Sequence, residues 1–357
     1  MASLALGVGV GHDVGMDSVA VVERFGLGGD VRVWLEEAER LPEPVRALEV
    51  PVGVEASRVL DLFALDGVDR AEVEVLWPGS GSVEGEWPPE LWHLVGCMYR
   101  RLCADADLPV GRWQGWPSLV EAEDPRVRVA SLWAFAARVG AQFEAHGALG
   151  VDPSVTVATL ADVGVQVARS RRMFGRLCLE TAAWVAAQFR GRLYWVGGLQ
   201  LEPGLLVDQG GVEWYAPEEA AGLGSGMGWG DMALRLHIPS GGLDPVSVDE
   251  ALGRARGFAR AHLGFDPVVA TCTSWLLDPQ WGEVLGEGSN IVGFQRRFTL
   301  VGEGRRGESD VFRFVFGRPV VDVSGVSGRT RLERAVVERL ESGGAWWVRT
   351  GWLRLVG

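Results

Sequence analysis

The spacing of apolar residues divides the chain into a helical first half and a mixed second half. Between about residue 90 and residue 190, apolar side chains recur every three or four positions, which is the pattern of helices that bury one face. Asp124 and Pro125 form a helix-start pair within this region. The pattern over residues 154–191 indicates two helices separated near Gly175. We therefore predict a mostly α-helical first half.

Near residue 191 the helical period gives way to the alternation that is typical of strands. Helices are still expected at three places: after a capping box of Ser247 and Glu250, within the amphipathic segment 280–294, and over residues 329–341. The other segments are predicted to contain strands: residues 191–207, 210–217, 233–239, 267–279, 296–302, 310–317 and 345–356. This order of elements predicts a mixed sheet.

The predicted elements place the chain in the α+β class, with two domains. We assign residues 16–155 to a mostly helical N-terminal domain and residues 156–357 to the mixed-sheet domain. Residues 1–15 are glycine-rich and weakly patterned, and we interpret them as a disordered leader, with Met16 as an alternative start. Their glycines lack the GxGxxG spacing of a dinucleotide-binding loop.

Composition excludes several classes of protein. The net charge is −13 and all 34 basic residues are arginines, which argues against a nucleic-acid-binding protein. No apolar run has the length of a membrane span. The four cysteines show no CxxC spacing, which favours free thiols in the cytoplasm. No HExxH or HxH motif is present, so we expect no catalytic metal.

The segment from His237 to Gly242 combines a titratable ring with exposed main chain. His237 ends a predicted strand, where it can accept a proton from a nucleophile. Ser240, Gly241 and Gly242 follow it, and their small side chains leave backbone amides open to a ligand. The alternative is a histidine that bonds to a turn carbonyl and has no catalytic role.

Two further segments of the second half carry polar residues at element ends. Ser274 shares a strand face with Cys272 near the end of an apolar strand, where the alternative to a site is a buried face of small residues. Asn290 lies in the run SNIVGFQRRF, where it either lines a polar pocket or caps a helix. The spacing around Ser274 does not match the nucleophile elbow of a serine hydrolase.

Several of these motifs together resemble a known family. The runs HIPSGGL, SWLLDP and SNIVGFQRRF, a segment ending in FVFG and a closing TRLERAV helix resemble the two-domain GNAT-like acyltransferases. The resemblance covers residues 155–357 best, and GLQLEP fits the strand that opens the C-terminal domain. It implies a helical N-acyltransferase N-terminal domain followed by a GNAT-like mixed-sheet α/β domain. The chain departs from the general pattern, since it lacks the [QR]xxGx[GA] phosphate loop and has no tyrosine after Tyr215.

The resemblance also implies an activity. Members include long-chain N-acyltransferases that acylate the amino sugar of teicoplanin-type antibiotics, so we expect acyl-CoA as the co-substrate, a small-molecule amine as the acceptor and no permanently bound cofactor. His237 is then the candidate base and Ser274 the candidate donor of a proton to the leaving thiolate. Ser240, Gly241 and Gly242 are candidates for binding CoA. The candidates for substrate binding are Trp214, Trp275 and Asn290.

Two alternatives to this activity stay open. In the first, the enzyme acetylates another small amine with a short-chain donor. In the second, the C-terminal half is non-catalytic and senses acyl-CoA. The chain length of the acyl group that is turned over separates the first alternative from long-chain transfer. Binding of acyl-CoA without turnover identifies the second.

Overall fold

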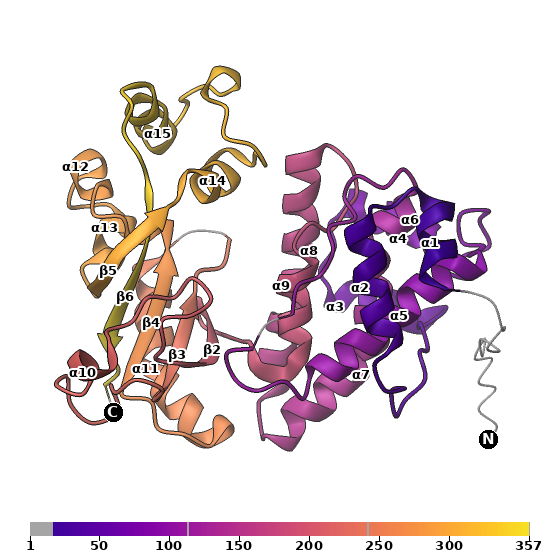
Figure 1. Ribbon diagram of the computed structural model, residues 1–357, viewed down its shortest axis with the longest axis horizontal. Helices are drawn as coiled ribbons and strands as arrows, with labels where there is room; N and C mark the ends of the chain where they lie inside the picture. The colour runs from indigo at the N-terminus through magenta and orange to yellow at the C-terminus, as the bar shows by residue number, and fades with distance from the viewer. Residues whose placement is uncertain (1–16, 113, 241–242, 357) are drawn as a thin grey trace. The chain divides into compact units, whose positions relative to one another are not determined.

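The computed structural model describes residues 17–112, 114–240 and 243–356, and it divides into two units (Figure 1). A helical unit contains the described residues up to Leu108, then Arg112–Ala148 and Thr156–Gly191. A sheet unit contains Pro109–Gly111, Leu149–Val155 and the described residues from Arg192 onwards. The predicted leader, residues 1–15, lies outside the described residues.

The helical unit is built around α5, which packs against α1, α2 and α7. Its apolar positions Leu91, Leu94, Val95 and Met98 are buried at the spacing that the sequence predicts, and they lie in one apolar core with residues of the surrounding helices. The helices are α1 (Ser18–Phe25), α2 (Gly29–Glu39), α3 (Val54–Leu62), α4 (Gly67–Leu76), α5 (Pro89–Asp105), α6 (Pro125–Arg128), α7 (Ala130–Ala148), α8 (Pro153–Phe174) and α9 (Ala182–Ala187).

The domain boundary differs from the one expected between residues 155 and 156. Helix α8 belongs mainly to the helical unit, because its residues Leu160, Val163 and Val167 are buried in that unit's core. The predicted break near Gly175 is present, since α8 ends at Phe174 and Gly175 has a φ of 70°. The observed division follows at residues 191 and 192, after α9.

A network of buried polar side chains joins helices of this unit. The fully buried ring of His146 accepts a hydrogen bond from Gln142 Nε2 at 2.8 Å and donates from Nδ1 to Thr156 Oγ1 at 2.8 Å. Gln142 also donates to the backbone oxygen of Gln188, whose own amide donates to the buried carboxylate of Asp162. Burial lowers the pKa of His146 to about 4, so the ring is neutral at pH 7.

The sheet unit contains a six-stranded mixed sheet in the order β1-β2-β3-β4-β6-β5. The strand pairs are antiparallel except for β3 and β4, which are parallel. The strands are β1 (Tyr194–Val196), β2 (Leu199–Leu205), β3 (Met232–His237), β4 (Val269–Ser274), β5 (Thr299–Arg306) and β6 (Trp347–Arg354). The helices of this unit are α10 (Pro217–Ala220), α11 (Pro245–Phe258), α12 (Trp281–Leu285), α13 (Asn290–Gln295), α14 (Glu308–Val311) and α15 (Arg331–Glu341).

The parallel strands β3 and β4 separate towards their carboxyl ends. Only two residue pairs are in register, Leu234 with Ala270 and Arg235 with Thr271. Beyond them β3 still pairs with β2 as far as His237, and β4 still pairs with β6 as far as Ser274. The facing edges of β3 and β4 are therefore unpaired with each other at the end where the candidate residues lie.

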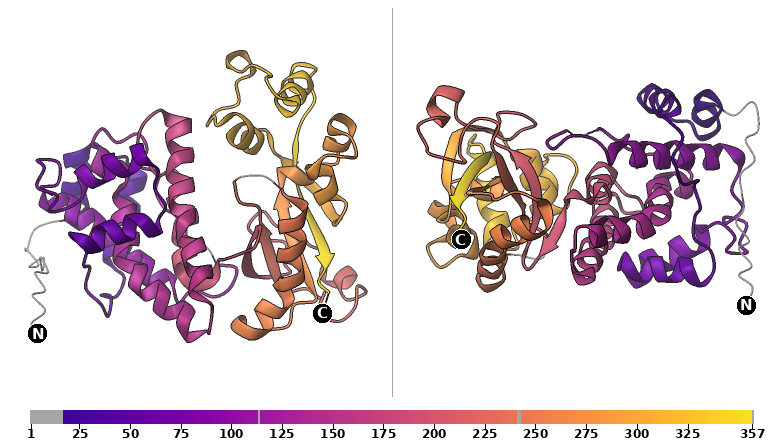
Figure 2. Two further views of the ribbon diagram at one scale, coloured as in Figure 1. Left: turned by 180° about the vertical axis from the view of Figure 1, so that it is seen from behind. Right: turned by 90° about the horizontal axis from the view of Figure 1, so that it is seen from below.

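One face of this sheet is apolar and is covered by α11, which lies along it in Figure 2. Val248, Ala251 and Ala255 of α11 share a buried core with the leucines of β2 and β3. The hairpin between β1 and β2 touches the helix closely, since a Cβ on Gly198 would lie 2.8 Å from Ser247 Cβ. Only glycine permits this approach.

Three predicted elements are wrong. Residues 310–317 form the end of α14 and a π-helical turn, Phe312–Phe316, rather than a strand, because Val311 and Phe312 are adjacent and both buried. Residues 210–217 contain only an isolated bridge and the start of α10. Helix α11 begins before the predicted capping box, because Asp244 is the N-cap and accepts from Ser247 N.

The closing helix α15 confirms its prediction, with a capping box formed by Thr330 and Glu333. No helix within residues 17–112, 114–240 and 243–356 is long and apolar enough to cross a membrane.

Candidate active site

The second face of the sheet carries a row of polar side chains at the diverging ends of β3 and β4. The strand register places Gln200 and Glu202 of β2 on the same face as Arg235 and His237 of β3. Thr271 of β4, which pairs with Arg235, is on this face too. The buried members are Gln200, Glu202 and Thr271. Such a buried polar row beside an unpaired strand edge is typical of a binding site.

His237 is held by a buried carboxylate. Its Nε2 lies 2.9 Å from Oε2 of Glu202, which is diagonally across the β2–β3 ladder. The Glu202 side chain is 9% exposed, whereas the His237 side chain is 27% exposed. The carboxylate fixes the orientation of the imidazole, while the ring remains accessible. This arrangement suits a general base that takes a proton and later releases it.

Three buried N–H groups on this face have no partner among the described residues. They are Nε2 of Gln200, which is paired in register with His237, Nε of Arg235 and Nε1 of Trp214. Trp214 packs in a small cluster with Ala233 of β3 and Val269 of β4, which point to the same face as His237. Because an unpaired buried N–H group is costly, these groups are candidates for bonding to a ligand.

The structure does not bring Ser274 to His237. Ser274 lies on the other face of β4, with Cys272, and its Oγ accepts a hydrogen bond from Leu276 N as the cap of the 3₁₀ turn Trp275–Leu277. This geometry removes Ser274 as the donor of a proton to a group near His237. Burial raises the pKa of the Cys272 thiol to about 12, so that thiol is no nucleophile either.

Trp275 and Asn290 lie outside the strands that carry the polar row. Trp275 is 9% exposed in the apolar core of the sheet unit, where it packs edge-on against Trp281. Asn290 is the first residue of α13, and it lines a shallow apolar hollow at the amino end of α11 together with Leu243, Pro245 and Arg297.

The predicted CoA-binding loop is described only in part. Ser240 is exposed in the turn after β3, and Gly241 and Gly242 lie outside the described residues.

Glu202 is the residue that the sequence motifs miss. Its signal is a carboxylate within the otherwise apolar and neutral run GLQLEPGLLV. A strand with one solvated face tolerates such a residue, so the signal is weak. Its pairing with His237, 35 residues away, depends on the register of β2 against β3. That register cannot be derived from the residues alone, because a long connection joins the two strands.

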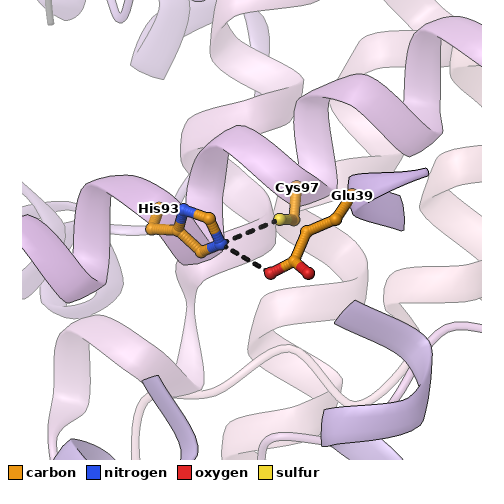
Figure 3. Close-up of side chains that lie close together, drawn as sticks. All are labelled: Glu39, His93 and Cys97. Atoms are coloured by element: carbon orange, nitrogen blue, oxygen red, sulfur yellow. Dashed lines mark hydrogen bonds and ion pairs between the residues drawn. The ribbon is translucent and has the colours of Figure 1, made fainter. Parts of the chain in front are cut away.

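The helical unit contains a separate cluster of candidate metal ligands, Glu39, His93 and Cys97 (Figure 3). The sequence motifs do not reveal it, because His93 and Cys97 are one helical turn apart on α5 and Glu39 lies at the end of α2. It is the one such group of three or more ligands found among the described residues.

Family models match both units of the chain. A model described as the N-acyltransferase N-terminal domain matches residues 54–191, and one described as the GNAT-like C-terminal domain matches residues 193–353. These matches meet where the helical unit and the sheet unit divide. No curated protein sequence matches the chain at a significant level.

Solved structures of acyltransferases are similar to the chain over almost all of its length. One, in complex with decanoyl-CoA and teicoplanin, is 29% identical with a TM-score of 0.80, and the match covers 96% of this chain and 100% of that one. An acyltransferase in complex with CoA and 10C-teicoplanin and an acyltransferase mutant in complex with octanoyl-CoA match with the same coverage and TM-score at 28% identity. The chain is therefore a two-domain acyltransferase, in which an N-acyltransferase N-terminal domain precedes a GNAT-like C-terminal domain.

Proposed function

We propose that the protein transfers a medium- or long-chain acyl group from acyl-CoA to the amino sugar of a teicoplanin-type glycopeptide, as a step of antibiotic biosynthesis. The similar solved structures hold octanoyl-CoA, decanoyl-CoA and teicoplanin. The observation that carries the proposal for this chain is the accessible ring of His237, held by the buried Glu202 at the point where β3 and β4 diverge. The reaction takes place in the cytoplasm and uses no resident cofactor.

The chemistry requires proton transfers to and from His237 and one exchange of bonds. A sugar ammonium first loses one proton to solvent, and His237 then takes a proton from the neutral amine as it attacks, directly or through a water molecule. The nitrogen lone pair then forms a bond with the thioester carbon, and the C–S bond breaks to give an amide and the thiolate of CoA. The imidazolium, held in place by Glu202, returns the proton to that thiolate or to solvent.

The diverging strands suit an extended thioester. The pantetheine amides bond to the main chain along the facing edges of β3 and β4, which lack each other as partners beyond Arg235 and Thr271. Main-chain N–H groups there polarise the thioester carbonyl. The two reacting groups are then held close together, which supplies much of the rate.

The phosphates of CoA are assigned to the amino end of α11, which follows β3 directly in the chain. Asp244 already occupies one first-turn amide of this helix, so the helix alone is a weak anion site. Arg297 lines the adjacent hollow and supplies a positive charge, although its guanidinium also pairs with Asp249 at 2.6 Å. Ser240 remains a candidate for contact with the phosphates.

A donor series with a defined acceptor tests the proposal. The full-length protein is incubated with a glycopeptide that carries a free amino sugar and with acetyl-, octanoyl- or decanoyl-CoA, and products are identified by mass spectrometry. We expect one added acyl group, with octanoyl and decanoyl transfer at least about tenfold faster than acetyl transfer, since each buried CH₂ contributes about 0.8 kcal/mol.

The alternatives give different outcomes in the same experiment. Acetyl transfer that exceeds decanoyl transfer indicates a short-chain acetyltransferase. If acyl-CoA stabilises the protein against heat but no free CoA is released with any amine supplied, the protein is a non-catalytic sensor. This outcome overturns the proposal.

A further inference from the structure

The cluster of Glu39, His93 and Cys97 brings three kinds of metal-ligand atom to one point, as Figure 3 shows. His93 Nε2 lies 2.9 Å from Glu39 Oε1 and 3.6 Å from Cys97 Sγ, and all three ligand atoms lie within 4.8 Å of one another. The i and i+4 spacing on α5 places the imidazole and the thiol on the same side of that helix. Glu39, the last residue of α2, completes the group from a second helix.

Hydrogen bonds give the Cys97 thiol only a weak role in this cluster. A proton on His93 Nε2 makes a good hydrogen bond to the Glu39 carboxylate, and the Cys97 sulfur, 3.6 Å from that nitrogen, is then a weak second acceptor. If Nε2 instead carries no proton and accepts from the Cys97 thiol, then Nε2 and the ionised Glu39 carboxylate are two acceptors with no hydrogen between them. A cation at the centre satisfies a lone pair on each of the three atoms.

The separations and the surroundings suit zinc. Metal–ligand bonds of about 2.0–2.3 Å in a tetrahedron imply ligand atoms about 3.3–3.7 Å apart. The 3.6 Å between His93 and Cys97 fits this range, and the 2.9 Å between His93 and Glu39 has to widen by about 0.5 Å. The Cys97 residue is 3% exposed, whereas the side chains of His93 and Glu39 are 23% and 26% exposed, which leaves an approach for an ion and a water molecule.

The arginine beside the cluster, Arg100, already has an acidic partner. Arg100 donates to the backbone oxygen of Glu39 at 2.9 Å, but its guanidinium pairs with the carboxylate of Glu43. Within the described residues, His93 is the one ion-pair partner of the Glu39 carboxylate.

We propose that Glu39, His93 and Cys97 bind one Zn²⁺ ion, with a water molecule as the fourth ligand. A combination of thiolate, imidazole and carboxylate selects zinc over magnesium or calcium. The ion links the end of α2 to the middle of α5, which is the central helix of the helical unit. This role is structural, and it does not depend on the acyl-transfer reaction.

Cobalt substitution tests the site directly. The full-length protein is freed of metal with a chelator and titrated with Co²⁺, and then with Zn²⁺ in competition. We expect one equivalent of Co²⁺ to give visible d–d bands together with a near-ultraviolet thiolate-to-cobalt band, and Zn²⁺ to abolish both. Bound Zn²⁺ should also raise the melting temperature.

Variants identify the ligands. Cys97→Ser should remove the thiolate band, and Glu39→Gln, which is a mild change at a partly exposed position, should weaken Co²⁺ binding more than about tenfold. The matched control is Cys103→Ser, which removes another thiol of α5 and should leave the spectrum unchanged. A thiolate band that persists in Cys97→Ser, or the absence of any such band in the wild-type protein, overturns the proposal.

Discussion

The two units of the molecule each bury a cluster of polar side chains around a histidine, and the two clusters differ in how far that histidine is exposed. In the helical unit, His146 is fully buried and both ring nitrogens have protein partners, Gln142 and Thr156. In the sheet unit, the His237 side chain is 27% exposed, and the amide nitrogen of Gln200 nearby has no partner among the described residues.

The difference separates a structural network from a site. Each bond in the network around His146 replaces one to water, so its loss leaves a buried group unsatisfied and destabilises the fold. In the row around His237, the amide nitrogen of Gln200 has no partner among the described residues and the imidazole is partly exposed, so a ligand can reach these groups. Changes in the first cluster should therefore alter stability, and changes in the second should alter turnover.

The largest expected effect is on catalysis by His237. His237→Ala removes the base, and we expect turnover of decanoyl-CoA to fall about 10²- to 10⁴-fold while binding of acyl-CoA is retained. Single-turnover mass spectrometry and a thermal-shift titration measure the two quantities. Ser274→Ala, on the other face of β4, serves as the control and should turn over at close to the wild-type rate. Equal losses in both variants would refute the assignment of faces.

The next effect is the response of the helical unit to acid. His146 has a folded-state pKa of about 4, below its ordinary value near 6.5, so the unfolded chain binds the extra proton first as the pH falls. The contribution to stability is complete above pH 6.5 and declines towards pH 4, by about 3 kcal/mol in all. Denaturant unfolding between pH 7 and pH 4 measures the loss. In His146→Gln, which cannot titrate, the same curve should be flatter, and an unchanged slope would contradict the prediction.

Glu202 is expected to act through His237. In Glu202→Gln the ring keeps a neutral hydrogen-bond acceptor but loses the charged one that holds its orientation, so kcat should fall about 10- to 100-fold with little change in KM for acyl-CoA. Steady-state kinetics separates the two constants. If KM alone rises, Glu202 contributes to binding rather than to the orientation of the base.

The smallest effect compares two buried glutamines. Gln200→Leu removes an amide nitrogen that has no partner among the described residues, so the free energy of unfolding should stay the same or rise by up to about 1 kcal/mol, while kcat/KM falls. Gln188→Leu removes an amide that bonds to Asp162, and it should destabilise the protein by about 1–3 kcal/mol. Denaturant titration of both variants decides. Equal destabilisation would mean that the side-chain amide of Gln200 contributes as much to stability as that of Gln188.

Local signals predicted much of the fold. The helix that follows Asp124–Pro125 begins at its cap, and Gly175 ends α8, because capping and left-handed glycine act over a few residues. A short apolar run such as residues 310–317 fits the period of a strand as well as that of a helix, so its type does not follow from the residues. The domain boundary does not follow from them either, because the pattern does not show which core buries α8.

The site was predictable only where its residues carry their own signal. His237 is marked by its position between an alternating strand and a loop of small residues. Ser274 is marked in the same way, but its place on the opposite face follows from the register with β3, which is a long-range property. The partners Glu202 and Glu39 are far from their histidines in the chain, so the structure is needed to show that each lies beside its histidine.

The separation of β3 and β4 after two registered pairs has a consequence for the free protein. Main-chain amides on the facing edges beyond Arg235 and Thr271 have no ladder to protect them from exchange with deuterated solvent. A thioester bound between β3 and β4 would protect these amides from exchange. The rate at which these few hydrogens are replaced is therefore a gauge of occupancy that needs neither turnover nor an acceptor.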